Sequence, residues 1–297
     1  MELLRMLETI RSPFLDTVIG LITRLGEEAV VLVIMCAIYW CINKKAAYRI
    51  GIAFFFSGIT AQGMKICFRI DRPWIVDPTL NPVPSALGQA TSYSFPSGHA
   101  QSAAALFGSL GVQIKRKPIK AACFIVIALV AFSRMYLGVH TLLDVAVSIA
   151  VSLLFVLLTV LLFTDGPSSR RRELIIAVFM VLYCLAAVAI ASVLYFGGTI
   201  EEKYLSDCLK AAGAGFGYAV GIYIERVYIC FSVKAKNLLY QIIKFAIGIA
   251  GVLVIMEGMK LLFGTGLVLD TVRYFLMIIW ITVLFPLIIK RFFVPLN

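Results

Sequence analysis

The stretch SRMYLGVHTLLDV, from Ser133 to Val145, places polar side chains inside an otherwise apolar part of the chain. It holds Arg134, His140 and Asp144 within eleven residues, although the whole chain has only two histidines. Apolar runs long enough to span a bilayer as helices lie on both sides of it. Because charged side chains at membrane depth are costly, the stretch predicts a functional turn between two membrane helices.

The composition favours an all-α polytopic membrane protein. The 297 residues are 61% hydrophobic and 14% charged, whereas soluble domains are about a quarter charged. A transmembrane β-barrel would show short alternating segments instead. The apolar runs predict a transmembrane helical bundle of about nine or ten spans, at about 29–43, 47–66, 98–114, 119–137, 140–163, 174–196, 210–230, 242–263 and 271–290, with a further N-terminal segment.

The net charge of +11 follows from basic clusters in alternate loops, near residues 44–49, 115–120, 170–172, 234–244 and 290–291. Such clusters lie in the cytoplasm, so loops 67–97, 134–140, 197–209 and 264–270 are expected on the outer side of a multi-pass plasma-membrane protein. No nucleic-acid motif accompanies the charge. The seven cysteines form no CxxC pair, so neither a zinc site nor a disulfide framework is predicted.

Four regions follow from these patterns. Residues 1–27 predict an amphipathic or first helix, residues 28–165 a core that carries the polar motifs, residues 166–173 a basic cytoplasmic linker, and residues 174–297 a C-terminal transmembrane extension. Within the extension, the small residues of GAGFGYAVG (213–221) predict tight helix packing. Glu257 and Lys260 are three residues apart, which predicts an ion pair, or alternatively a role in the passage of a substrate or ion.

Two further polar islands lie on the predicted outer side. Lys65 and Arg72 are seven residues apart in KICFRIDRP, so they share a helical face if the helix continues to Pro73. Cations gathered on the outer side oppose the usual charge trend, which favours an anionic ligand. In PSGH, Ser97 is expected to cap a helix whose free backbone N–H groups bind an anion, and Gly98 lets that anion approach closely.

His140 and Asp144 are four residues apart and therefore neighbours on one helical face. A carboxylate that accepts a hydrogen bond from one imidazole nitrogen fixes the tautomer and leaves the other nitrogen free to attack. Arg134 lies six residues before His140 and would not share its face on an unbroken helix. A bend at Gly138 is therefore predicted.

The three islands K-x6-R-P, P-S-G-H and S-R-x5-H-x3-D, in this order, resemble the type 2 phosphatidic acid phosphatase (PAP2) superfamily of integral-membrane lipid phosphatases. This superfamily is related to vanadium haloperoxidases and bacterial acid phosphatases, and the resemblance covers residues 28–165. It implies a phosphatidate phosphatase/haloperoxidase-like helical core followed by an extension that the core does not require.

By residue, the resemblance implies that His140 is the nucleophile that forms a phosphohistidine, that Asp144 orients it, and that His99 is the general acid. The phosphoryl oxygens would be bound by Lys65, Arg72 and Arg134, with help from Ser97 and Gly98. Family members need no metal or other cofactor. The residues agree, since two histidines cannot form a three-His zinc site.

The expected function is hydrolysis of a phospholipid or polyprenyl phosphate in the bilayer at the extracytoplasmic face. The substrate would be a phosphate monoester or a terminal diphosphate, of the phosphatidate, phosphatidylglycerophosphate or undecaprenyl diphosphate type. Three alternatives remain: a lipid phosphotransferase with the same residues, a lipid-phosphate transporter or flippase built on the extra spans, and a binding protein without turnover.

Overall fold

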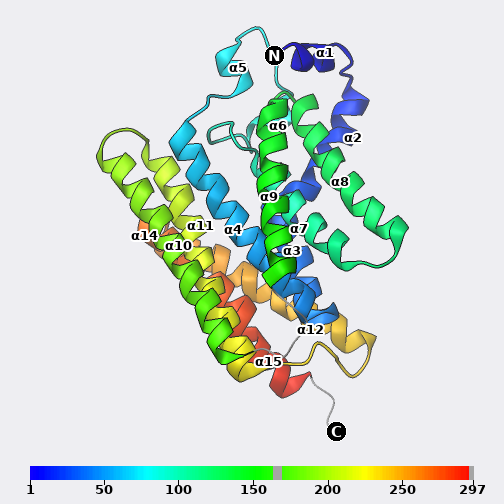
Figure 1. Cartoon of the computed structure of the whole chain (residues 1–297), viewed down its shortest axis with the longest axis vertical. Coiled ribbons are helices and arrows are strands. Elements are labelled where there is room, and N and C mark those ends of the chain that lie inside the picture. Colours follow the sequence, from blue (N-terminus) through cyan, green and yellow to red (C-terminus); the bar gives the residue numbers. More distant parts are fainter. Residues whose placement is uncertain (163–168, 294–297) are drawn as a thin grey trace. The chain divides into compact units, whose positions relative to one another are not determined.

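The computed structural model describes residues 1–162 and 169–293, and every regular element within these residues is helical (Figure 1). The helices of the first part of the chain are α1 (Glu2–Thr9), α2 (Pro13–Thr23), α3 (Glu28–Ala37), α4 (Lys44–Phe68), α5 (Pro73–Val76), α6 (Pro84–Leu87), α7 (Gly98–Gln113), α8 (Lys117–Tyr136) and α9 (Leu142–Leu162). The remaining helices are α10 (Arg170–Phe196), α11 (Glu202–Ile224), α12 (Leu238–Leu253), α13 (Met259–Phe263), α14 (Leu267–Ile279) and α15 (Phe285–Phe292).

The chain forms two units. Unit 1 contains Met1–Leu32 and Ile52–Leu162, and unit 2 contains Val33–Gly51 together with the described residues from 169 onward. The division of the sequence into four regions stays a prediction. Residues 166–168 of the predicted basic linker lie outside the described residues.

Helix α7 lies at the centre of unit 1, against α8 and α9. Its sequence is rich in alanine, and Ala100, Ala103, Ala104 and Ala105 are fully buried. Such small side chains let neighbouring helices approach closely in a membrane protein. The polar side chains of α7 are also satisfied inside the bundle, because Gln101 Nε2 donates to Ser57 Oγ on α4 at 2.7 Å. Helix α7 therefore forms the core of the unit that carries the polar motifs.

The corner between α8 and α9 is built by local sequence. Helix α8 ends at Tyr136, and Gly138 adopts the left-handed φ of +76°, so the predicted bend is confirmed. Helix α9 opens with a reciprocal cap, in which Asp144 N–H donates to Thr141 Oγ1 at 3.3 Å and Thr141 N–H donates to Asp144 Oδ2 at 2.7 Å. This is the capping-box arrangement, with Asp at the third helical position.

The N-terminal segment is tied to this corner within unit 1, and Figure 1 shows α1, α5 and α6 at the same end of the unit. Arg11 Nε donates to the carbonyl oxygen of Tyr136 at 2.9 Å, and Arg5 pairs with Asp77 at 2.6 Å. The loop between α4 and α7 is irregular apart from the two four-residue helices α5 and α6. Its Val83 N–H also donates to the carbonyl oxygen of Leu137 at 3.0 Å.

In unit 2, α11 packs closely against α14 and the π-helical turn that follows it. A Cβ atom added at Gly217 would lie 2.7 Å from the carbonyl oxygen of Phe275, and Gly213 and Gly221 leave equally little room. The tight packing predicted for GAGFGYAVG is therefore confirmed. Glu257 and Lys260 are both exposed, and the described part of the chain shows no ion pair between them, so the predicted pair is not present.

Among the described residues, six segments are long and apolar enough to cross a membrane, or up to seven if the pair Pro13–Gly26 and Glu28–Ile42, bent by 53°, counts as one span. This number of candidates is lower than the nine or ten spans predicted from the sequence. Two predicted spans account for much of the difference. Helix α7 has only 16 residues, fewer than the roughly 20 that span a bilayer. Charged residues and glycines interrupt the apolar sequence of α11.

Candidate active site

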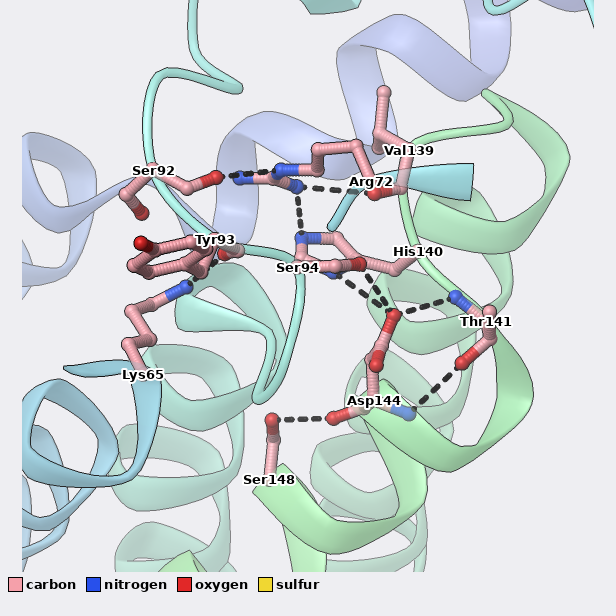
Figure 2. Close-up of polar contacts among 10 residues, drawn as sticks. All are labelled: Lys65, Arg72, Ser92, Tyr93, Ser94, Val139, His140, Thr141, Asp144 and Ser148. Atoms are coloured by element: carbon pink, nitrogen blue, oxygen red, sulfur yellow. Dashed lines mark hydrogen bonds and ion pairs between the residues drawn. The ribbon is translucent and has the colours of Figure 1, made fainter. Parts of the chain in front are cut away.

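The three polar islands meet at one end of unit 1. Lys65 lies in the last turn of α4, Ser97 directly precedes α7, and Arg134 lies in the last turn of α8. His140 lies in the corner between α8 and α9, where Figure 2 shows its contacts with the first island. Ser97 N–H donates to the carbonyl oxygen of Asp144 at 3.2 Å, which joins the second island to the third.

Lys65 and Arg72 converge by a route that the sequence did not predict. Helix α4 ends at Phe68 and Arg69 has a φ of +50°, so the helix does not continue to Arg72, and the predicted shared helical face is wrong. Instead, Lys65 Nζ donates to the carbonyl oxygen of Tyr93 at 2.7 Å and Arg72 Nε to that of Ser92 at 2.8 Å (Figure 2). The loop before α7 thus holds both cations, and both side chains are buried.

Arg72 also determines which nitrogen of His140 is free of hydrogen. Arg72 Nη1 lies 2.9 Å from His140 Nε2, and it also donates to the carbonyl oxygen of Val139 at 3.0 Å. A guanidinium group has donors only, so Nε2 must accept. The neutral ring therefore carries its hydrogen on Nδ1, and the lone pair of Nε2 points toward the cations.

Nδ1 of His140 faces Asp144. Asp144 Oδ2 lies 3.5 Å from this nitrogen, longer than an ordinary hydrogen bond, and accepts shorter bonds from Ser94 Oγ at 2.6 Å and Thr141 N–H at 2.7 Å (Figure 2). Ser94 Oγ itself lies 3.5 Å from Nδ1. His140 and Asp144 are each 2% exposed. Asp144 thus caps α9 and places a carboxylate beside the imidazole with one side chain.

Two buried polar atoms at the site, Ser97 Oγ and Arg134 Nε, have no hydrogen-bond partner among the residues that the structure describes. Ser97 occupies the N-cap position of α7, as predicted, but its side chain makes no capping hydrogen bond. A Cβ atom added at Gly98 would meet nothing within 4 Å. Since buried donors in proteins are almost always satisfied, the two orphaned atoms and the open space at Gly98 fit an anion as their acceptor.

His99 stands in the first turn of α7, which is not among the candidate spans. Its Nε2 lies 3.0 Å from Gln89 Oε1, at the exposed side of the site. Burial, and then the positive charge of Arg134, lower the pKa of His99 to about 3, with smaller contributions from Arg72 and Lys65. His99 of the second island therefore lies close enough to the cations of the first and third islands for their charges to lower its pKa.

The same physical causes act on His140, which lies outside the membrane-spanning helices. Burial lowers its pKa well below the usual value, and the positive charges of Arg72, Arg134 and Lys65 lower it further. Both imidazoles are consequently neutral near pH 7 when no anion is bound.

Three contacting residues were not found from the sequence. Ser94 bonds Asp144, Thr23 accepts a hydrogen bond from Arg134 Nη1 at 2.9 Å, and Gln89 bonds His99. Ser94 and Gln89 belong to the polar loop 67–97, but nothing in its composition separates Ser94 from the nearby Ser92. Thr23 comes from the N-terminal segment, more than a hundred residues from its partner, and carried no signal.

Two models of known families match this chain. A model of the PAP2 superfamily matches residues 46–167, and a model described as the transmembrane extension of PAP2 superfamily phosphatases matches residues 209–295. The chain belongs to the PAP2 superfamily. It is an integral-membrane PAP2 phosphatase, that is, a phosphoric ester hydrolase of a family that acts on lipids in the bilayer.

Among solved structures, the crystal structure of Aquifex aeolicus LpxE is similar to this PAP2 phosphatase, with 24% sequence identity and a TM-score of 0.48. The match covers 54% of this chain and 93% of the LpxE chain. A comparison with curated proteins found no match. In the described part of the chain, no group of three or more His, Cys, Asp or Glu residues is placed to hold a metal ion, and metal independence stays a prediction.

Proposed function

We propose that this PAP2 phosphatase hydrolyses a lipid phosphate monoester or diphosphate without a metal, through a phosphohistidine on His140, at the extracytoplasmic face. The observation that carries the proposal is the 2.9 Å contact between Arg72 Nη1 and His140 Nε2. It supports a neutral imidazole whose Nε2 lone pair is directed at the place where a phosphoryl oxygen would meet Arg72.

In the first step, the phosphoryl oxygens take over the donors of Lys65, Arg72 and Arg134, with Ser97 Oγ and the N-terminus of α7. These groups neutralise the charge on the equatorial oxygens, which is the main task of a catalyst of phosphoryl transfer. Arg72 Nη1 then no longer occupies His140 Nε2, and this nitrogen attacks phosphorus in line with the leaving oxygen. The P–N bond forms, the P–O bond breaks, and its electron pair stays on the leaving oxygen.

His99 supplies the proton in that step. The bound phosphate offsets the cations that hold its pKa down, so His99 takes up a proton in the complex and gives it to the leaving oxygen. Asp144 stabilises the positive charge of the phosphorylated imidazole, whose hydrogen stays on Nδ1.

In the second step, water attacks phosphorus and gives a proton to His99, which is now neutral. The P–N bond breaks, its electron pair returns to His140 Nε2, and inorganic phosphate leaves. The expected substrates are lipid phosphates of the phosphatidate, phosphatidylglycerophosphate or undecaprenyl diphosphate type. A lipid is expected because the four helix ends that form the site belong to apolar helices. The basic loops at the other end of these helices support the extracytoplasmic placement.

The test is phosphate release by the purified full-length chain from a panel of these lipids, with and without EDTA. Wild-type turnover should persist in EDTA and disappear in His140→Ala. Rapid quenching at alkaline pH, with a substrate labelled in the phosphate, should trap a labelled protein that is stable in base and labile in acid. No such label should form on His140→Ala.

Unchanged turnover of His140→Ala, or loss of wild-type activity in EDTA, would contradict the proposal. Labelled water and added alcohols distinguish hydrolysis from transfer: label in phosphate means hydrolysis, and a new phosphate ester means a phosphotransferase. For the location of the site, a membrane-impermeant phosphate ester should be hydrolysed by intact cells that express the protein, and only after lysis if the site faces the cytoplasm.

A further inference from the structure

The segment TRLGE, from Thr23 to Glu27, joins α2 to α3 through a short 3₁₀ turn. It lies outside the three polar islands and before residues 46–167, where the family model matches. Within unit 1, however, it contacts two of the proposed catalytic groups in three separate ways.

The first contact orients Arg134. Its Nη1 donates to Thr23 Oγ1 at 2.9 Å, and the two residues are 1% and 6% exposed. The Nε of the same guanidinium is buried and has no hydrogen-bond partner within 1–162 and 169–293. Thr23 therefore holds one edge of a planar donor group and leaves another donor directed elsewhere, as a fixed ligand for an oxyanion requires.

The second contact is a close approach. A Cβ atom added at Gly26 would lie 2.6 Å from the carbonyl oxygen of His99 and 2.8 Å from Val130 Cγ1. Both neighbours belong to helices, and one is backbone, so neither moves easily out of the way. Only glycine lets the turn lie directly against the first turn of α7, where His99 stands.

The third contact is a chain of hydrogen bonds at the exposed side of the site. Gln89 Nε2 donates to Glu27 Oε1 at 2.8 Å, and Gln89 Oε1 lies 3.0 Å from His99 Nε2. A carboxylate only accepts, so Glu27 turns the amide with its nitrogen toward itself and its oxygen toward His99. His99 Nε2 must then carry a hydrogen, and Nδ1 is the nitrogen that gains and loses the transferred proton.

We propose that Thr23–Glu27 is a fourth element of the phosphatase site: Thr23 positions Arg134 as a phosphoryl ligand, and Glu27, through Gln89, positions His99 to donate its proton from Nδ1. The inference rests on the proposed function, because it takes Arg134 as a ligand and His99 as the general acid. Neither Thr23 nor Glu27 is a catalytic residue, since each acts through another side chain.

The Thr23 half is tested by binding. Thr23→Val should weaken competitive inhibition by inorganic phosphate about tenfold, because the buried guanidinium loses an acceptor. Thr23→Ser keeps the hydroxyl and should restore inhibition to near the wild-type value. Thr17→Val is the matched control on the same helix, since the Thr17 hydroxyl donates to the carbonyl oxygen of Pro13, within its own helix. Thr17→Val should leave inhibition unchanged.

The Glu27 half is tested by leaving-group dependence. Glu27→Ala and Gln89→Leu should lower kcat for a lipid phosphate about 3- to 10-fold, because each removes a hydrogen bond at a partly exposed position. Nitrophenyl phosphate should be affected far less, because its leaving oxygen needs little protonation. Glu27→Gln keeps an amide oxygen that accepts from Gln89 and should restore most of the rate, which separates hydrogen bonding from charge. Glu2→Ala, at an exposed glutamate of α1, is the control and should leave both rates unchanged.

A double-variant cycle separates the two proposals. In a His99→Asn background, which should already have lost the acid, Glu27→Ala should cause no further loss. Full activity of His99→Asn on lipid phosphate would contradict the proposed function itself. If His99→Asn is slow, the proposed function stands and two results would overturn the fourth element alone. One is an equal loss on both substrates in Glu27→Ala. The other is phosphate binding by Thr23→Val that matches the wild type.

Discussion

At the scale of single residues, Asp144 serves two purposes. Its carboxylate closes the cap of α9 through Thr141 and faces His140 Nδ1, while Ser94 donates to the same oxygen. A helix cap is rigid because it is bonded to the backbone, so the carboxylate is oriented before any substrate arrives. Ser94, in contrast, comes from the loop before α7.

Ser94→Ala is therefore expected to lower kcat about tenfold, since a hydrogen bond to a charged group contributes about 1.5–3 kcal/mol. Inhibition by inorganic phosphate should change little, because Ser94 does not contact the three cations in the described structure. Ser92→Ala is the control, since Ser92 contributes its carbonyl oxygen to Arg72. Equal losses in both variants would show that Ser94 acts only through the loop.

The pH profile gives a second prediction for a single residue. Because burial and the charges of Arg72, Arg134 and Lys65 lower the pKa of His140, the ring stays neutral as the pH falls through the ordinary histidine range. We expect no acid limb from His140 in kcat/KM near about pH 6.5. An acid limb that belongs to the phosphate substrate moves when an aryl phosphate of lower pKa is used. A limb that stays near the ordinary histidine pKa with both substrates would refute the prediction.

At the scale of elements, the corner between α8 and α9 sets the distance between Arg134 and His140. Gly138 makes this turn with a φ of +76°, and a Cβ atom there would lie 2.8 Å from Arg11 Nη2 and 3.2 Å from Pro82 Cα. The N-terminal segment and the loop therefore both close on the corner. A side chain at this position would strain the backbone and push both neighbours away.

Gly138→Ala should consequently lower activity at least tenfold. In addition, an alanine in the left-handed conformation should lower the free energy of unfolding by about 1–2 kcal/mol. Gly198→Ala is the matched control, because Gly198 has a φ of +69° with open space around its Cβ position, in the turn between α10 and α11. Thermal unfolding and turnover of both variants are the measurements. Similar small losses in both would mean that the corner tolerates displacement.

Across the whole molecule, charge is buried in unit 2 as well as at the site. Glu225 is fully buried, and it accepts from Lys44 Nζ at 3.0 Å, from the Tyr48 hydroxyl and from Phe231 N–H at 3.2 Å. Three lysines also donate to backbone carbonyls of residues 229–233, which follow Glu225 in the sequence: Lys44 to Phe231, Lys244 to Val233 and Lys290 to Ile229. Through these contacts, lysines of α4, α12 and α15 hold residues 229–233 in place within unit 2.

Removal of one member of such a network leaves its partners unpaired. Glu225→Ala should therefore destabilise the protein by about 3–5 kcal/mol, read as a lower Tm of the detergent-solubilised chain. Glu201→Ala is the control, since the pair between Glu201 and Lys203 is exposed and such pairs contribute about 0–1 kcal/mol. A Tm for Glu225→Ala equal to that of Glu201→Ala would contradict a structural role for the network.

The sequence was sufficient for the helical fold class, for the family and for the bend at Gly138, because apolar periodicity, spacing and glycine chemistry are local properties of the chain. The sequence predicted more spans than the six or seven candidates among the described residues, because α7 is shorter and α11 more polar than the candidate spans. It also continued the helix of Lys65 too far, since nothing local announced the left-handed turn at Arg69.

The chemical identity of the site was therefore readable from residue types, whereas its shape was not. Ser94 beside Asp144, Thr23 beside Arg134 and Gln89 beside His99 join residues between 10 and 111 positions apart. Such contacts exist only after the helices have packed, because side chains from separate elements meet through the paths of the loops rather than through any repeat in the sequence. For the same reason, the tautomer of His140 and the orphaned donors of Ser97 and Arg134 became visible only in three dimensions.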